Sequence, residues 1–343
     1  MSHGPPPSSA SVSSDTGLVY ARRATGDLLL DLHRPGPADR PVPVVLWLHG
    51  GGWFTGDRTL APDLAHHVRA TGCAFASIEY RLSGQALFPA QLHDVRAAIR
   101  FLRARAGEYG LDPRAIGAWG ASAGGHLAAL AGLTGHLAAL PGEETEGDAS
   151  VQAVAESYGP GDLAAVAAEA AARSGRDVAS SPEARLLGGP PAERAELARY
   201  ADPLTWVRPA APPFQISHGT ADDLVSHTQS ERLHEALAAE GVSSELYLLH
   251  GYRHGFLNPA GRLDVRTARM MDDGRLAAEG PAPAEYRASN GSACRTGDAG
   301  ASNGPATFGF DDIDSFFRRH LTPGTTDRPA ARPRPRPTSG EPR

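Results

Sequence analysis

The chain has 343 residues, of which 41% are hydrophobic and 21% are charged, a composition typical of a globular protein rather than a disordered or membrane-embedded one. The formal net charge of -6 and the isoelectric point near 6.2 exclude the broad positive field with which proteins bind nucleic acids or anionic membranes. Two cysteines, Cys73 and Cys294, are too few for a disulfide framework or a cysteine-rich zinc site.

Short apolar strands alternate with helical patterns along most of the chain. In chain order we predict a strand at 42–48, a helix at 60–70, a strand at 73–80, a helix at 90–105, a strand at 115–119, a helix at 123–133, strands at 151–158 and 214–217, a helix at 228–239, a strand at 245–249 and a helix at 311–320. This alternation is typical of an α/β fold with a mostly parallel sheet and helices on both faces. We expect one such domain over residues 17–321.

Four segments lie outside this alternation. Residues 1–16 and the Pro/Arg-rich residues 322–343 are predicted to be disordered tails. Residues 161–212 combine Ala-rich helical pieces with Pro clusters, which favours an inserted helical cap over the carboxyl edge of the sheet. Residues 259–306 are rich in Gly, Ala, Ser and Asn with weak periodicity. We expect a long mobile insertion there, with a functional lid as the alternative.

The sequence contains no recognisable targeting or membrane-spanning segment. Residues 1–16 lack the apolar stretch of a secretory signal. The longest apolar runs, such as Val44–Leu48, are far shorter than the ~18 residues that a membrane helix needs. We therefore expect a cytoplasmic protein with no membrane partner.

The segment Gly120-Ala121-Ser122-Ala123-Gly124 lies directly between a predicted strand and a predicted helix. A strand, a sharp turn and a helix form a nucleophile elbow, in which flanking glycines allow a strained turn that exposes the serine hydroxyl. The start of the helix also offers free backbone N–H groups beside that hydroxyl. Ser122 is therefore the candidate nucleophile.

A run of glycines follows the strand at 42–48, in His49-Gly50-Gly51-Gly52-Trp53. Consecutive glycines let backbone N–H groups turn toward one point, as an oxyanion hole requires. In an acyl-transfer enzyme, Gly51, Gly52 and the N–H of Ala123 would together bind the oxyanion. Trp53 and Phe54 are candidate walls of an acyl pocket, with packing against the cap as the alternative.

A serine nucleophile needs a base, and the base needs an acid that orients it. The strand at 214–217 leads into Asp222 and Asp223, and the strand at 245–249 leads into His250 and His254. In each pair only one residue is expected to take the role. We choose Asp222 as the acid and His254 as the base.

Taken together, these motifs resemble those of the α/β-hydrolase esterases, in particular the hormone-sensitive-lipase-like and feruloyl-esterase-like (BD-FAE) carboxylesterases. The resemblance covers residues 17–258 and the last helix, and rests on HGGGW (49–53), EYRL (79–82), FPAQLHD (88–94), GLDP (110–113), GAWGASAGGHL (117–127), HGTAD (218–222) and HGF (254–256). It implies a triad of Ser122, Asp222 and His254, with Asp222 preferred because that family's acid ends an H-G-x-x-D motif. It also implies oxyanion donors at Gly51, Gly52 and Ala123, and no cofactor.

Residues that the sequence lacks narrow the alternatives. There is no lysine, so all 33 basic residues are arginines, and a Walker A protein, a Schiff-base enzyme and a Ser–Lys hydrolase are excluded. The histidines show no metal-ligand spacing, so no metal is expected. Cys73, in an apolar strand, is expected to be an inert core thiol.

The expected function is hydrolysis of carboxylic esters with small or medium acyl groups, through an acyl-enzyme. The expected partner is a small-molecule ester, and the sequence does not indicate an oligomeric state. An acyltransferase or cyclase with the same triad is the nearest alternative. A non-catalytic binding protein on a hydrolase scaffold is a more distant one.

Overall fold

The computed structural model describes residues 11–36, 39–261, 270–289 and 303–322. Most of the two predicted tails, and Cys294, lie outside these described residues. Within them, every helix is too short or too polar to cross a lipid bilayer.

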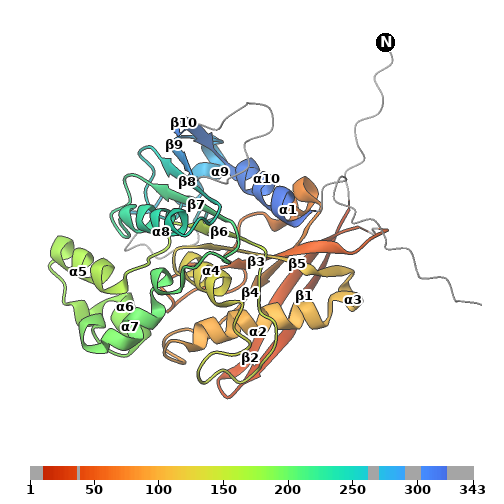
Figure 1. The fold of residues 1–343 in the computed structure, drawn as a ribbon, viewed down its shortest axis with the longest axis horizontal. Helices are drawn as coiled ribbons and strands as arrows, with labels where there is room; N and C mark the ends of the chain where they lie inside the picture. Colours follow the sequence, from red (N-terminus) through yellow and green to blue (C-terminus); the bar gives the residue numbers. More distant parts are fainter. Residues whose placement is uncertain (1–10, 37–38, 262–269, 290–302, 323–343) are drawn as a thin grey trace, which may run out of the picture.

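The described residues build a ten-stranded sheet (Figure 1). Its strands are β1 (Val12–Arg23), β2 (Gly26–Pro35), β3 (Val42–Leu48), β4 (Ala74–Ile78), β5 (Leu111–Ala121), β6 (Ala153–Ser157), β7 (Phe214–Gly219), β8 (Ser244–Leu249), β9 (Ala282–Ala288) and β10 (Gly304–Phe308). Their spatial order is β1-β2-β4-β3-β5-β6-β7-β8-β9-β10. The run from β4 to β8 is parallel, and the outer pairs are antiparallel. The predicted mostly parallel sheet is confirmed.

Helices cover both faces of the sheet. One face packs against α2 (Ala90–Ala104), α4 (Ala123–Thr134) and α8 (Thr228–Ala239), and the other against α1 (Leu64–Thr71) and α10 (Phe310–Leu321). The side chains of β3 show why, because Leu46 belongs to the first apolar cluster and its neighbour Trp47 to the second. A strand that buries both faces appears in the sequence as an unbroken apolar run. A short helix, α3 (Ala106–Tyr109), precedes β5.

The prediction of a disordered tail over residues 1–16 is wrong from Val12 onward. Strand β1 begins there and pairs with β2 as an antiparallel hairpin, with Val12 opposite Pro35. The strand lies at the edge of the sheet, and most of its side chains are exposed or half-buried. Its Ser-rich composition is tolerated because backbone hydrogen bonds to β2, rather than apolar burial, hold it in place.

The prediction of a long mobile insertion over residues 259–306 is also wrong for the residues that the structure describes. They include α9 (Arg275–Glu279), β9 and β10. Strand β9 pairs with β8, and β10 pairs with β9, so this segment extends the sheet. Its side chains alternate between buried and exposed along β9, with Ala282, Ala284 and Tyr286 buried.

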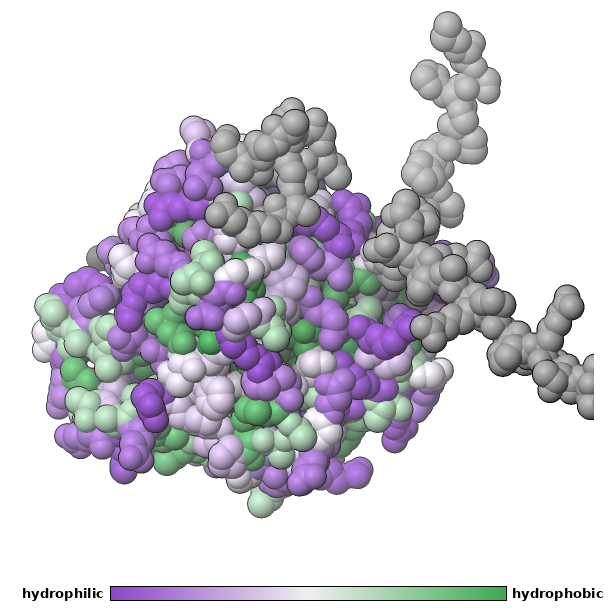
Figure 2. Space-filling model, viewed as in Figure 1, coloured by the Kyte–Doolittle hydropathy of each residue, from purple (hydrophilic) through white to green (hydrophobic). Residues whose placement is uncertain are grey.

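The predicted cap segment, residues 161–212, is helical and lies at one end of the molecule, at the left of Figure 1. It contains α5 (Leu163–Ser174), η1 (Val178–Ser180), α6 (Pro182–Leu187), η2 (Pro191–Arg194), α7 (Ala195–Ala201) and η3 (Pro203–Trp206). Side chains cap these short helices: Asp162 accepts from the Ala165 N–H, and Ser181 from the Ala184 N–H, both at 3.0 Å. On the face seen in Figure 2, polar and apolar residues alternate in small patches.

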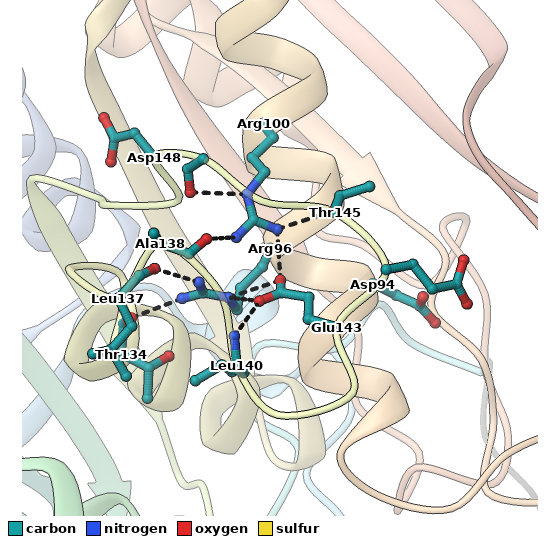
Figure 3. A network of polar contacts seen from close by, with 12 residues as sticks. Asp94, Arg96, Arg100, Thr134, Leu137, Ala138, Leu140, Glu143, Thr145 and Asp148 are labelled. Atoms are coloured by element: carbon teal, nitrogen blue, oxygen red, sulfur yellow. Dashed lines mark hydrogen bonds and ion pairs between the residues drawn. The ribbon is translucent and has the colours of Figure 1, made fainter.

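A buried ion-pair network ties the segment after α4 to α2 (Figure 3). Arg96 of α2 is buried and donates from Nε to Glu143 at 2.9 Å. Its other two nitrogens donate to the carbonyl oxygens of Thr134 and Leu137, at 2.7 and 2.6 Å. Arg100 also donates to Glu143. The Arg96 guanidinium therefore satisfies the last carbonyl group of α4, the helix that follows Ser122, and one carbonyl group in the turn after it.

Candidate active site

Ser122 occupies a sharp turn between the last residue of β5 and the first residue of α4. Its φ of 56° and ψ of -122° are rare for a residue with a side chain. A Cβ on Gly120 would lie 2.1 Å from the Gly124 carbonyl oxygen, and a Cβ on Gly124 would lie 1.9 Å from that of Leu48. Only glycine fits at these two positions, so the turn depends on both of them.

Two side chains continue from Ser122 in hydrogen-bond contact. His254 Nε2 lies 2.7 Å from Ser122 Oγ, and His254 Nδ1 lies 2.6 Å from Asp222 Oδ2. The three residues follow β5, β7 and β8, so the parallel strands deliver them to the same edge of the sheet. Asp222 and His254 are buried, whereas the alternatives Asp223 and His250 are exposed. The structure therefore brings together the three residues chosen from the sequence.

The carboxylate of Asp222 has partners on both oxygens. Oδ1 accepts from the N–H groups of Leu224 and Val225, both at 2.9 Å. Oδ2 faces His254 and also His218, whose Nε2 is 3.2 Å away. Burial alone would raise the pKa of Asp222, but the two histidines outweigh it and hold this pKa well below its ordinary value. Asp222 is therefore suited to remain charged beside an imidazolium.

The glycine run after β3 lies against Ser122. A Cβ on Gly50 would be 3.4 Å from the Ser122 Cβ. Gly51 and Gly52 have φ values of 106° and 57°, a conformation that favours glycine. Over the part of the chain that the structure describes, the N–H groups of Gly51, Gly52 and Ala123 meet no hydrogen-bond acceptor. Such free donors next to a serine hydroxyl are what an oxyanion requires.

His49 anchors this glycine run. Its ring stacks on Tyr80 with the ring centroids 4.3 Å apart, and the Tyr80 hydroxyl donates to the His49 carbonyl oxygen at 2.8 Å. Burial lowers the pKa of His49 to about 4, so the ring is neutral at pH 7. The neutral His49 ring packs between Tyr80 and the loop at Gly56.

The two residues predicted as pocket walls occupy different environments. Trp53 is 2% exposed and packs edge-on against His126, with ring centroids 5.3 Å apart. Phe54 is 39% exposed, and its ring lies 4.8 Å from the Arg185 guanidinium of α6. Phe54 also lies beside Gly52, where an added Cβ would meet its ring at 2.7 Å. Phe54 thus lies between the glycine run and the cap, whereas Trp53 packs inside.

The segment before α9 holds the loop that carries His254. Met271 forms a parallel β-bridge with His254, and the Asp272 N–H donates to the His254 carbonyl oxygen at 2.8 Å. The Asp272 carboxylate accepts from the Arg253 N–H at 2.7 Å and pairs with the Arg253 guanidinium. These residues come from the predicted mobile insertion, and they support the loop of the candidate base.

A buried row of polar side chains next to Asp222 was not predicted from the sequence. These are His218 at the end of β7, Ser230 on α8 and Glu156 on β6. His218 lies in the same H-G-T-A-D segment as Asp222, which was one available signal. Glu156 is a charged residue inside a predicted apolar strand, which is unusual unless it has partners.

A group of potential metal ligands lies elsewhere, at the contact between α1 and α10. His66, Asp311 and Asp314 each place one ligand-type atom within 4.8 Å of the others. His66 and Asp311 are exposed, and Asp314 Oδ1 lies 2.7 Å from His67 Nδ1, where it joins α10 to α1. Cys73 is fully buried, and burial raises its pKa to about 11, as expected for an inert thiol.

Two family models match the chain. The BD-FAE model matches residues 30–237, and the dienelactone hydrolase family model matches residues 198–277. The first range contains Ser122 and Asp222, and the second contains Asp222 and His254. The two matched ranges together therefore span the whole hydrogen-bonded set.

Two curated relatives come from Mycobacterium tuberculosis. Esterase LipC is 34% identical over 232 residues, which is 66% of this chain and 57% of that protein. Esterase LipQ is 32% identical over 260 residues, which is 75% of this chain and 60% of that protein. The chain thus spans less than two thirds of the length of these relatives.

Among solved structures, a truncated carbohydrate esterase from gut microbiota matches with a TM-score of 0.62 and 30% sequence identity, covering 74% of this chain and 92% of that one. The architecture is the α/β-hydrolase fold, as the sequence motifs predict. Because the BD-FAE model covers more than half of the residues and the fold agrees with it, this chain belongs to the BD-FAE family.

Proposed function

We propose that this chain is a serine carboxylesterase that hydrolyses esters of small or medium acyl groups through an acyl-enzyme. The observation that carries the proposal is the hydrogen-bonded line from Asp222 through His254 to Ser122, with contacts of 2.6 and 2.7 Å. A serine hydroxyl is a weak nucleophile until a base in this position removes its proton. The esterase names of the relatives support the same chemistry.

In the acylation step, His254 Nε2 accepts the Ser122 proton while Ser122 Oγ bonds to the ester carbonyl carbon. The resulting oxyanion accepts hydrogen bonds from the N–H groups of Gly51, Gly52 and Ala123. His254 then donates its proton to the leaving alcohol. Asp222 holds the ring orientation and stabilises the imidazolium without taking the proton itself.

Deacylation repeats these roles with water as the nucleophile. His254 removes a proton from the water, the same three N–H groups hold the second oxyanion, and His254 returns the proton to Ser122. The mechanism requires neither a metal ion nor an organic cofactor. An added alcohol that competed with water would give a transferred ester, so product analysis with added alcohol measures how far the enzyme acts as an acyltransferase.

The size of the acyl group is argued from the side chains beside the glycine run. Phe54 lies next to Gly52, and the first residue of α6 comes close on the same side, since an added Cβ on Gly52 would meet Pro182 Cβ at 3.4 Å. An aromatic wall and a nearby cap helix leave the shorter acyl chains as the better fit. The likeness to a carbohydrate esterase supports an acylated sugar as the natural substrate, with the sugar as the alcohol part of the ester.

The test is hydrolysis of p-nitrophenyl esters from acetate to palmitate by the wild type, Ser122→Ala and Ser180→Ala. Ser180 is an exposed serine of the cap and serves as the matched control. We expect Ser122→Ala to lose roughly 10⁴–10⁶ in kcat with an unchanged circular dichroism spectrum, and Ser180→Ala to match the wild type. Activity retained by a folded Ser122→Ala enzyme would mean that another group is the nucleophile.

A further inference from the structure

The buried row of His218, Ser230 and Glu156, here called the inner row, continues the hydrogen-bonded line beyond Asp222. His218 Nδ1 lies 2.8 Å from Ser230 Oγ, and Ser230 Oγ lies 3.5 Å from Glu156 Oε2. All three side chains are buried, and they come from β7, α8 and β6. The line from Ser122 therefore runs through Asp222 to a second histidine and ends at a second carboxyl group.

The environment of His218 Nε2 fixes a proton on that nitrogen. It lies 2.9 Å from the Val225 carbonyl oxygen and 3.2 Å from Asp222 Oδ2. A carbonyl oxygen and a carboxylate can only accept hydrogen bonds, so a bare nitrogen between them would be repelled by both. His218 therefore donates its Nε2–H toward both oxygens and contacts the same Asp222 oxygen, Oδ2, that His254 contacts.

The other ring nitrogen depends on Ser230, whose hydroxyl has a single proton. When Glu156 is protonated, its O–H can donate to Ser230, and Ser230 then donates to His218 Nδ1. When Glu156 is ionised, the Ser230 hydroxyl donates to Glu156 instead, and His218 Nδ1 loses that donor. Burial raises the pKa of Glu156 to about 7, which favours the first arrangement below that pH.

Other titratable groups near the inner row do not compete for this role. His126 of α4 shares a cavity of about 10 Å³ with Glu156, and burial lowers the His126 pKa to about 4, so it is neutral. Tyr158, the residue after β6, has its ring 6.5 Å from that of His218 and 4.9 Å from that of His254; burial raises its pKa well above its ordinary value, so it is also neutral. Asp222 and His254 are the remaining neighbours.

We infer that His218 is a positioning residue for the acid of the proposed triad: its Nε2–H holds Asp222 in line with His254, and Ser230 and Glu156 keep the His218 proton on Nε2. The inference rests on the proposed function, because it assigns Asp222 the role of acid. His218 also affects how much of the Asp222 charge faces His254. A carboxylate oxygen that already accepts a hydrogen bond from His218 offers less charge to His254, so loss of that hydrogen bond leaves more charge facing the His254 ring.

The experiment compares His218→Asn with His218→Gln in the full chain. The Gln amide reaches the position of Nε2 and can still donate to Asp222, whereas the shorter Asn amide ends near Nδ1 and cannot. We expect His218→Asn to lower kcat about tenfold with less than a twofold change in KM, the effect of one lost hydrogen bond. The acidic limb of its kcat/KM profile should move to higher pH. His218→Gln should keep the wild-type limb, as should His250→Asn, the exposed control.

A second pair of variants, at Ser230, tests the same inference if His218→Asn fails to fold. Ser230→Ala removes the partner of Nδ1, and Ser230→Thr keeps the hydroxyl. We expect the alanine variant to move the acidic limb in the same direction and the threonine variant to restore it. A purely structural role would reduce the fraction of protein that a serine-directed phosphonate titrates, without moving the limb.

Three results overturn the inference. The first is a wild-type kcat and acidic limb in folded His218→Asn and Ser230→Ala. The second is a loss of activity equal to the loss of titratable serine, with the limb unmoved. The third is an active Ser122→Ala enzyme, measured in parallel, which would reject the proposed function itself and so is distinguishable from the first two.

Discussion

Asp222 accepts hydrogen bonds from four directions, and this explains why a buried charge is tolerated beside the nucleophile. Two backbone N–H groups, His218 and His254 surround the carboxylate. A buried carboxylate with fewer partners would protonate instead. The two backbone donors, Leu224 and Val225, come from the same turn as Asp222 itself, so part of the carboxylate's environment is local in sequence.

Asp222→Asn should lower kcat roughly 10⁴-fold while leaving the protein folded. The amide would donate to His254 Nδ1 and so force a proton onto Nε2, where the ring must accept the Ser122 proton. The matched control is Asp223→Asn, because Asp223 is adjacent and exposed. Steady-state kinetics with p-nitrophenyl acetate measures both variants. Equal losses in the two variants would contradict the assignment of the acid.

The buried carboxyl of Glu156 should make the free energy of unfolding depend on pH. Its pKa is raised from 4.5 to about 7, so between these values the folded protein holds a proton that the unfolded chain releases. The free energy of unfolding therefore falls as the pH rises through this interval, by up to about 3 kcal/mol. Glu156→Gln should gain stability relative to the wild type between pH 5 and 8 in urea denaturation. A constant difference would contradict the raised pKa.

At the scale of elements, the strands that the sequence predicts are those buried on both faces. The run at Val42–Leu48 is unbroken and apolar, so its assignment needs no knowledge of neighbours. Strand β9 reads Ala-Pro-Ala-Glu-Tyr-Arg-Ala, which contains weak strand formers, and it becomes a strand by pairing with β8. The edge strand β1, which is rich in Ser and Asp at its start, was not predicted for the same reason.

In the candidate site too, residues within local motifs were predictable, and residues that meet only through long-range contacts were not. Ser122, Asp222 and His254 were predictable because each lies just past a recognisable strand, in a local motif. The inner row was not, because Glu156 and Ser230 lie 74 residues apart and meet only through the order of the strands. The support of His254 by Asp272 was hidden in a segment with weak periodicity. Long-range partners of this kind leave little local signal in a single sequence.

Asp272→Ala should loosen the loop that carries His254. The change removes a buried acceptor from the Arg253 N–H and guanidinium. We expect the free energy of unfolding to fall by about 2 kcal/mol and kcat to fall about tenfold, because the base loses its support. Glu285→Gln is the control, since it removes a partly exposed ion pair with Arg287 on β9. Thermal unfolding and steady-state kinetics give the two readouts. A kcat equal to that of the control would argue against a support role.

For the molecule as a whole, helix α4 is held at both ends by buried titratable side chains. At its start, a Cβ on Gly125 would meet Glu156 Oε1 at 3.0 Å, so this carboxyl packs against the first turn. At its end, Arg96 binds the last carbonyl group and pairs with Glu143 (Figure 3). Helix α4, which follows Ser122, therefore contacts Glu156 of the inner row at its first turn and Arg96 of α2 at its last residue.

Glu143→Gln should destabilise the protein without a large effect on kcat. It leaves the buried Arg96 without its charged partner, which costs about 3–5 kcal/mol in comparable pairs. Glu144→Gln is the neighbouring control, because the Glu144 side chain is 60% exposed. Guanidinium denaturation measures both. Equal stabilities of the two variants would show that Arg96 finds another partner.

The order of the three site residues along the chain, after β5, β7 and β8, also affects when the proposed activity appears during synthesis. The base follows the nucleophile by 132 residues, and its loop is held by residues further on still. A chain emerging from the ribosome thus exposes the elbow and the glycine run long before His254 exists. A partly made chain carries a serine without its candidate base, so we expect the proposed ester hydrolysis to begin only after β8 and the segment around Met271 have joined the fold.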